Sequence, residues 1–151
     1  MEGGCTCKAI RYRLEDKPMI VHCCHCSWCQ RETGSAFVIN AVIETGRVSL
    51  LSGQPELVLT PSASGRGQKI MRCPTCWVAL WSHYSQDAMA FVRVGTLDDP
   101  NWAPPDVHIF TSTKQDWVVL PEGAKAYPEF YQFADVWSPE SRERARVARG
   151  R

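Results

Sequence analysis

Seven of the eight cysteines in this chain fall into three short clusters, and no other feature of the sequence limits the fold as strongly. Two clusters are pairs, Cys5-Thr-Cys7 (the 5/7 pair) and Cys73-Pro-Thr-Cys76 (the 73/76 pair), and the third is the triad Cys24-His-Cys26-Ser-Trp-Cys29. Two pairs can complete a closed tetrahedral zinc site, whereas a triad leaves one of the four positions open. Because catalytic zinc sites keep such an opening for water or substrate, we predict two metal sites and expect chemistry at the triad.

The start of the chain bears on the redox state of these thiols. The sequence Met-Glu-Gly-Gly-Cys has neither the basic region nor the apolar run of a secretory signal. No stretch approaches the roughly 18 apolar residues of a membrane span. We therefore expect a cytoplasmic protein that does not enter a membrane. In that compartment clustered cysteines bind metal more often than they form disulfides, which are the alternative.

Spacing alone leaves the pairing of the clusters open. One arrangement joins the last two cysteines of the triad with the 73/76 pair as a zinc ribbon. About 40 residues separate them, however, against roughly 15–20 in zinc ribbons, and Cys24 would be left between two sites. The other arrangement joins the 5/7 pair with the 73/76 pair and uses each cluster whole, so we prefer it.

Two positions beside the pairs carry expectations about the backbone. Trp77 follows the 73/76 pair where such a turn favours glycine, because the position can require a positive φ. Either the turn relaxes or Trp77 covers one face of the site. Gly3 and Gly4 precede the 5/7 pair, and we expect a loop there that lets the backbone approach the metal closely.

The remaining cysteine and the histidines are expected to play supporting roles. Cys23 points opposite Cys24 on a strand, so we expect a buried structural thiol, with a reactive role as the alternative. His25 lies inside the triad, where a place behind the ligands or at the surface is favoured over ligation. Half-buried histidines without a metal are expected at His22, His83 and His108.

The composition is that of one folded domain. The chain has 151 residues, of which 44% are hydrophobic and 22% charged, and its formal net charge is +1. We expect the domain to cover residues 1–137 and a basic tail or helix to cover residues 138–151. The five arginines of that tail have no interleaved aromatic residues, so nucleic-acid binding is not favoured. The oligomeric state stays open, a homodimer included.

Short β-type segments dominate the pattern, and helix signals are scarce. Two hairpins are expected, one joining residues 37–43 to 48–51 and one joining 79–83 to 88–94. A short turn is expected at 29–33, and a terminal helix at 138–147 with Ser138 as N-cap and Pro139 at the first helical position. The expected strands are residues 9–14, 19–23, 37–43, 48–51, 57–60, 68–72, 79–83, 88–94 and 107–110.

Three segments together resemble the glutathione-dependent formaldehyde-activating (GFA) family, which includes centromere protein V. They are Gly3-Gly4-Cys5-x-Cys7-x₄-Tyr12, Cys24-His25-Cys26-x₂-Cys29-x₄-Gly34-Ser35-Ala36-Phe37 and Cys73-x₂-Cys76. The later segments 94–98 and 108–110 are also similar. The resemblance implies a single-domain β-tent fold of short antiparallel strands around a structural zinc, with two zinc ions per chain. It places the structural ion at Cys5, Cys7, Cys73 and Cys76, and the catalytic ion at Cys24, Cys26 and Cys29.

The activity that the resemblance implies is addition of glutathione to formaldehyde, giving S-hydroxymethylglutathione, by a carbon–sulfur lyase. The donor set agrees, since a zinc ion with three thiolates carries one net negative charge and is a poor activator of water. Such a soft site suits capture of a substrate thiol. Glu32 and His25 are candidate proton shuttles, and Arg31 is a candidate contact for a substrate carboxylate.

Two other functions stay open at this stage. One is a zinc-stabilised binding module without catalysis, for which the arginine-rich tail would supply a salt-dependent contact. The other is a thiol redox enzyme similar to type B methionine sulfoxide reductases, which would have to use Cys23. The sequence does not identify the thiol or the aldehyde.

Overall fold

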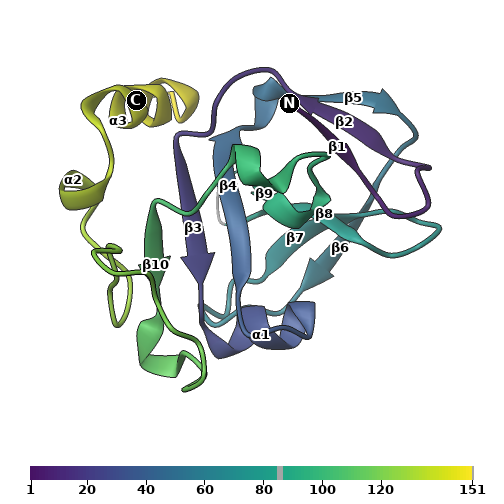
Figure 1. Ribbon diagram of the computed structural model, residues 1–151. Coiled ribbons are helices and arrows are strands. Elements are labelled where there is room, and N and C mark those ends of the chain that lie inside the picture. The colour runs from purple at the N-terminus through teal and green to yellow at the C-terminus, as the bar shows by residue number, and fades with distance from the viewer. Residues whose placement is uncertain (85–86, 151) are drawn as a thin grey trace.

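Two β-sheets form the framework of the computed structural model, which describes residues 1–84 and 87–150 (Figure 1). The predicted mainly-β class is confirmed. The strands are β1 (Glu2–Gly4), β2 (Arg11–Leu14), β3 (Ile20–Cys24), β4 (Val38–Glu44), β5 (Val48–Ser52), β6 (Glu56–Thr60), β7 (Gln68–Arg72), β8 (Ala79–His83), β9 (Met89–Arg93) and β10 (Val107–Ile109). The helices are α1 (Ser27–Thr33), α2 (Phe133–Val136) and α3 (Pro139–Ala148), and the 3₁₀ turns are η1 (Thr45–Arg47), η2 (Val94–Thr96), η3 (Pro100–Trp102) and η4 (Thr111–Thr113).

The two sheets differ in size and are linked at one edge. The smaller has the order β1-β2-β5, and the larger has the order β10-β3-β4-β9-β8-β7-β6. Strand β10 runs parallel to β3, and the other pairings are antiparallel. A bridge between Gly3 and Leu97 connects β1 to the chain that leaves the larger sheet. Strand β3, which lies between β10 and β4, ends at Cys24 and so positions the first residue of the triad.

One predicted hairpin is confirmed and the other is wrong. Strands β8 and β9 pair as expected for residues 79–94. Strands β4 and β5 do not pair, because β4 joins β3 and β9 while β5 joins β2 in the other sheet. The turn η1 separates them: the Thr45 N–H donates to the Ala88 carbonyl beside β9, and the Arg47 carbonyl accepts from Glu15 beside β2.

The glycines before the 5/7 pair form strand β1 and not the expected loop. A Cβ atom on Gly3 would lie 2.7 Å from the Tyr12 hydroxyl, and one on Gly4 would lie 2.4 Å from the Ile10 carbonyl oxygen. The absence of side chains thus lets β1 pack closely on β2. The close approach is to protein backbone and Tyr12 rather than to a metal.

Apolar layers cover both faces of the larger sheet. Alternation along β3 sends Val21 to one face and Ile20 and Cys24 to the other. The first layer joins β2 to β4, β8 and β9 and contains Ile10, Tyr12, Leu14, Ala41, Ile43, Leu80, Trp81 and Val92. The second layer lies under the C-terminal segment and contains Val38, Val42, Val107, Ile109, Tyr131, Trp137 and Ala145.

Helix α3 confirms the predicted terminal helix and its cap. The Ser138 hydroxyl accepts a hydrogen bond from the Ser141 N–H at 3.0 Å. The helix packs on the larger sheet, where Ser141 donates to the Met19 carbonyl at 2.7 Å and Arg144 pairs with Glu44 at 2.6 Å. The division between 137 and 138 stays a prediction, and Arg151 lies outside the described residues. Within the described part of the chain, no helix has the length and apolar character needed to cross a membrane.

Candidate metal centres and active site

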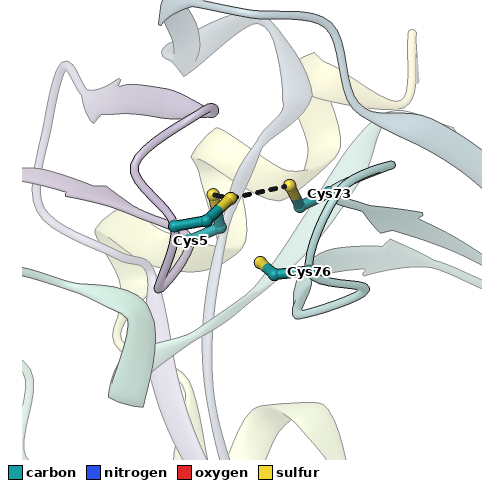
Figure 2. Close-up of side chains that lie close together, drawn as sticks. Cys5, Cys73 and Cys76 are labelled. Carbon is teal, nitrogen blue, oxygen red and sulfur yellow. Dashed lines mark hydrogen bonds between the residues drawn. The ribbon is translucent and has the colours of Figure 1, made fainter.

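The 5/7 and 73/76 pairs come together as a four-cysteine cluster, the pairing that the sequence analysis preferred. Cys5, Cys73 and Cys76 point toward one another from two loops in Figure 2. The Cys7 sulfur lies 3.5 Å from that of Cys5 and 3.6 Å from that of Cys73, and the four sulfurs lie within 4.8 Å of one another. Four sulfurs around a tetrahedral zinc are about 3.8 Å apart. The cluster therefore fits one zinc ion with no position left open.

Left-handed residues close both turns of this cluster. Lys8 has φ 63° and follows the 5/7 pair, and Trp77 has φ 59° and follows the 73/76 pair. The Trp77 N–H donates to the Cys73 carbonyl at 2.9 Å, and the Lys8 N–H donates to the Cys5 carbonyl at 3.0 Å. The turn keeps the conformation that favours glycine, so it does not relax. The Trp77 side chain is 53% exposed beside it.

Backbone N–H groups donate hydrogen bonds to cysteine sulfurs of this cluster. Ile10 and Thr75 donate to the sulfurs of Cys5 and Cys73, at 3.3 and 3.4 Å. Backbone hydrogen bonds from Cys7 and Val78 lower the pKa of the Cys76 thiol to about 6. Such bonds stabilise thiolates, which are the form that binds metal.

The triad lies where strand β3 passes into helix α1. Cys24 ends the strand, Cys26 caps the helix, and Cys29 is in its first turn. The Cys29 N–H donates to the Cys26 sulfur at 3.3 Å, which curls the backbone around the three thiols. The sulfurs of Cys24 and Cys29 are 3.4 Å apart, and all three lie within 4.8 Å of one another. This spacing fits three ligands of one tetrahedral ion.

The three thiols are hydrogen-bonded to one another, and these contacts shift the pKa values of Cys24 and Cys26 in opposite directions. Hydrogen bonds with Cys26 and Cys29 raise the pKa of Cys24, whereas hydrogen bonds from Cys24 and Cys29 lower the pKa of Cys26 to about 2. Neighbouring thiolates repel one another, so only part of the triad ionises in the absence of a metal. A dipositive ion would take the place of these protons.

A cavity of about 610 Å³ opens over the triad and is lined by all three of its cysteines. Its walls are strongly aromatic. Of its described lining residues, Glu129 has the one carboxylate, and none is a lysine or an arginine. The aromatic lining consists of Trp28, Tyr84, Phe91, Phe110 and Phe130, and Phe110 has a positive φ of 56°. The open side of the triad therefore faces a sheltered and largely apolar space.

A row of polar side chains runs across three strands beside this cavity, and two of them, His22 and Asn40, line it. His22 on β3 lies opposite Asn40 on β4, which lies opposite Arg93 on β9. Arg93 donates to the Asn40 Oδ1, so the amide nitrogen of Asn40 is left to donate to a substrate. His22 shares a hydrogen bond of 2.5 Å with the Tyr131 hydroxyl, and burial lowers the pKa of His22 to about 4.

The proton shuttles and the substrate contact predicted from sequence lie elsewhere. Glu32 forms an ion pair with Arg72 and lines a separate hollow. Arg31 lines an open hollow beside Trp117, and His25 is fully buried. None of these three is among the described residues that line the cavity over the triad. Their assigned roles stay predictions.

Cys23 is buried on the other side of β3, as expected for a structural thiol. Its side chain is 2% exposed, and burial raises the pKa of the Cys23 thiol to about 12. A redox enzyme needs an accessible thiol that ionises readily, so this geometry speaks against that alternative. All eight cysteines are free thiols.

Sequence reasoning missed two polar side chains that line the cavity, those of His22 and Asn40. Strand alternation could have found His22, because it lies two residues before Cys24 and so shares its face of β3. Asn40 carried no local signal, since its role depends on the register of three strands that are distant in sequence. The same is true of Phe110 and Phe130, which the chain brings back over the sheet after β10.

Comparisons with known proteins agree with the cysteine geometry. The family model for the glutathione-dependent formaldehyde-activating enzyme matches residues 1–113. The chain is 25% identical over 123 residues to a protein of Talaromyces marneffei and 26% identical over 128 residues to one of Halomonas elongata. Each of these relatives has the name "Putative glutathione-dependent formaldehyde-activating enzyme".

Coverage differs between these relatives. The first alignment covers 79% of this chain and 65% of the T. marneffei protein, so the chain spans about two thirds of that relative's length. The second covers 80% of each protein. A crystal structure of a Rhodobacter sphaeroides protein has the same fold, with a TM-score of 0.50 and 24% identity over 65% of this chain and 88% of that one.

The family match extends over most of the chain and includes both cysteine pairs, the triad, Asn40 and His108. The chain belongs to the glutathione-dependent formaldehyde-activating enzyme family.

Proposed function

We propose that this chain is a zinc-dependent carbon–sulfur lyase that adds a thiol, glutathione or a similar one, to formaldehyde or another small aldehyde. The reverse cleavage uses the same site. The observation that carries the proposal is the convergence of three free thiols on the wall of a sheltered cavity. Family membership supports the reaction class, and a cytoplasmic location is part of the same proposal.

The proposal assigns one zinc ion to each all-cysteine cluster. Cys5, Cys7, Cys73 and Cys76 would hold the structural ion. A zinc ion held by Cys24, Cys26 and Cys29 would supply a free coordination position in which a substrate thiol binds as its thiolate. The cavity side chains then have to place the aldehyde and move a proton.

The addition forms one carbon–sulfur bond and turns the aldehyde carbonyl into a hydroxyl. The proton that leaves the thiol must reach the carbonyl oxygen, on which negative charge develops. The Asn40 amide nitrogen can donate to that oxygen, because Arg93 holds the other end of the amide. The aromatic walls exclude water and hold both reactants together.

Two side chains of the cavity wall, His22 and Glu129, are candidates for carrying the proton. Glu32 and His25, the candidates from sequence, are not among the described residues that line the cavity. Glutamine variants of the four residues separate these assignments. A true shuttle loses rate and changes the pH profile, whereas a structural residue changes stability instead.

The test of the proposal is a metal count paired with an activity assay. Cys29→Ser should contain one zinc ion fewer than the wild-type protein, keep its fold, and lose thiol–aldehyde addition. Ser27→Ala, a substitution of similar size between the same ligands, should keep both the metal and the activity. A Cys29→Ser protein with full zinc content would contradict the site. Full zinc content in the wild type with no turnover on any thiol and aldehyde would leave a binding module as the better account.

A further inference from the structure

We propose that Cys23, His25 and His108 form a further metal-binding site, distinct from the two all-cysteine clusters, for a zinc-like transition ion with mixed sulfur and nitrogen ligands. This site does not depend on the proposed activity. It gives a role to the one cysteine that both clusters leave out, and to a buried histidine that does not line the cavity over the triad.

The register of β3 and β10 brings these three residues together. His108 lies opposite Cys23 in the parallel pairing of the two strands. The His25 N–H donates to the Ile109 carbonyl at 3.0 Å, so the pairing continues past the end of β3. Cys23 and His25 are two residues apart and share one face, while Cys24 between them faces the triad cavity. The same segment therefore presents metal ligands on both of its faces.

The distances suit coordination of one ion. The Cys23 sulfur is 3.5 Å from the His25 Nε2, and that nitrogen is 3.0 Å from the His108 Nδ1. All three ligand atoms lie within 4.8 Å of one another. Around a tetrahedral zinc ion, sulfur and nitrogen ligands are about 3.6 Å apart and two nitrogens about 3.3 Å apart. The Cys23–His25 and His25–His108 spacings therefore lie within about 0.3 Å of those of a tetrahedral zinc ion.

The His25 Nε2 can make an ordinary hydrogen bond to only one of the two groups that face it. The His25 Nε2 has either one proton or one lone pair, yet both a thiol and another imidazole nitrogen face it. Cys23 and His25 are 2% and 0% exposed, so water does not make up the difference. An ion at the centre would use one lone pair from each of the three atoms at once. The His25 Nδ1 has no partner in either state and does not decide between them.

The donor set also predicts the character of the site. One thiolate and two imidazoles suit zinc, cobalt or copper, and leave a zinc ion with one net positive charge, unlike the triad. The three residues line none of the four hollows described around the molecule. We assign the ion a structural role, in which it would clamp β10 to the strand that holds Cys24.

Cobalt(II) uptake tests the proposal with the triad disabled. The background is the double variant Cys26→Ser and Cys29→Ser, with zinc in its four-cysteine cluster. We expect this protein to take up one Co²⁺ per chain, without losing zinc, and to show a sulfur-to-cobalt charge-transfer band. His108→Gln in this background should abolish the uptake. His83→Gln is the matched control, because His83 is also buried but lies on β8, with its Nδ1 on the Met89 carbonyl.

Two results would overturn the site: no cobalt bound beyond the zinc, or uptake that His108→Gln leaves unchanged. If His108→Gln does not fold, as judged by circular dichroism and its zinc content, Cys23→Ala makes the same test. Loss of the charge-transfer band in Cys23→Ala supports the site, and its persistence overturns it.

Discussion

The hydrogen bond from Arg93 to the Asn40 Oδ1 fixes the orientation of the Asn40 amide group. Arg93 is buried, and among the described residues it forms no ion pair; its guanidinium donates to the Asn40 Oδ1. Asn40 lines the cavity that contains the triad, and its amide nitrogen is the end that Arg93 leaves free. A fixed N–H donor in a sheltered site stabilises developing oxyanion charge without reorganisation. One residue thus links the packing of three strands to the proposed chemistry.

Replacing this amide tests the link. Asn40→Asp keeps an oxygen acceptor for Arg93 but has no N–H group to donate, so we expect kcat/KM for the thiol addition to fall about 100-fold. Zinc content and the melting temperature should change little. Asn40→Ala, which also leaves Arg93 without its acceptor, should lose activity and stability together. Steady-state rates and a metal count check both variants, and unchanged rates in both would remove Asn40 from the mechanism.

Polar contacts from Ser141 and Arg144 hold helix α3 on the larger sheet. Ser141 donates to the Met19 carbonyl, and Arg144 forms two hydrogen bonds with the Glu44 carboxylate at 2.8 and 2.6 Å. Arg149 lies over the Phe133 ring at 5.3 Å. Two arginines of the C-terminal segment, Arg144 and Arg149, therefore contact other parts of the molecule. This arrangement weakens the case for a nucleic-acid-binding tail.

The Glu44–Arg144 pair makes the docking of α3 sensitive to acid. Burial is the largest single effect on the pKa of Glu44 and would raise it. Hydrogen bonds from Arg144 and the backbone, together with the charges of Arg144 and Arg47, outweigh burial in sum, so the pKa lies below its ordinary value. The pair therefore stabilises the fold fully above the ordinary pKa of glutamate, and this stabilisation is lost as the pH falls through the lowered value. Near neutral pH we expect Glu44→Gln to lower the free energy of unfolding by about 1–3 kcal/mol.

Urea unfolding at a series of pH values measures this effect. The difference between wild type and Glu44→Gln should shrink as the pH falls below the lowered pKa of Glu44. Glu122→Gln, on an exposed loop, should show no comparable difference. A gap between wild type and Glu44→Gln that stays constant down to strongly acidic pH would show that the charge of Glu44 is not what holds the helix.

The local sequence pattern predicted most individual strands correctly, but it did not predict which strands pair with one another. The bounds of β7 and β8 equal the predicted ranges 68–72 and 79–83, because turn residues flank each strand. The predicted hairpin of 37–51 failed because pairing partners depend on contacts with β2 and β9, which no local pattern encodes. The triad could be read from spacing, since its ligands are within six residues. The cavity above it needed Phe110, Phe130 and Asn40, which only the tertiary fold brings together.

At the scale of the whole molecule, the cavity combines the proposed metal site with walls whose described residues include no lysine or arginine. A substrate carboxylate inside it would meet Glu129 and aromatic rings, without a lysine or arginine among the described lining residues. An unpaired charge in such a space is costly. Under the proposed function we therefore expect a preference for thiols whose buried part is uncharged, with the carboxylates of glutathione outside the cavity.

A matched pair of small thiols tests this preference. We expect the methyl ester of 3-mercaptopropionate to have a kcat/KM at least about tenfold higher than the free acid, a difference that corresponds to roughly 1.4 kcal/mol. Glu129→Gln should narrow the gap by removing the like charge. The same formaldehyde concentration and metal content are used throughout. Equal or better use of the free acid would show that a cation reaches the substrate.

Thiol capture at the triad is the central claim, and cobalt spectroscopy tests it most directly. In a Cys23→Ala protein with zinc in the four-cysteine cluster and Co²⁺ in the triad, we predict that a substrate thiol adds a fourth sulfur to the cobalt. The sulfur-to-cobalt charge-transfer band should gain intensity in a saturable way, and an equal concentration of the corresponding alcohol should have no effect. A spectrum that the thiol leaves unchanged, at concentrations that support turnover, would contradict the account.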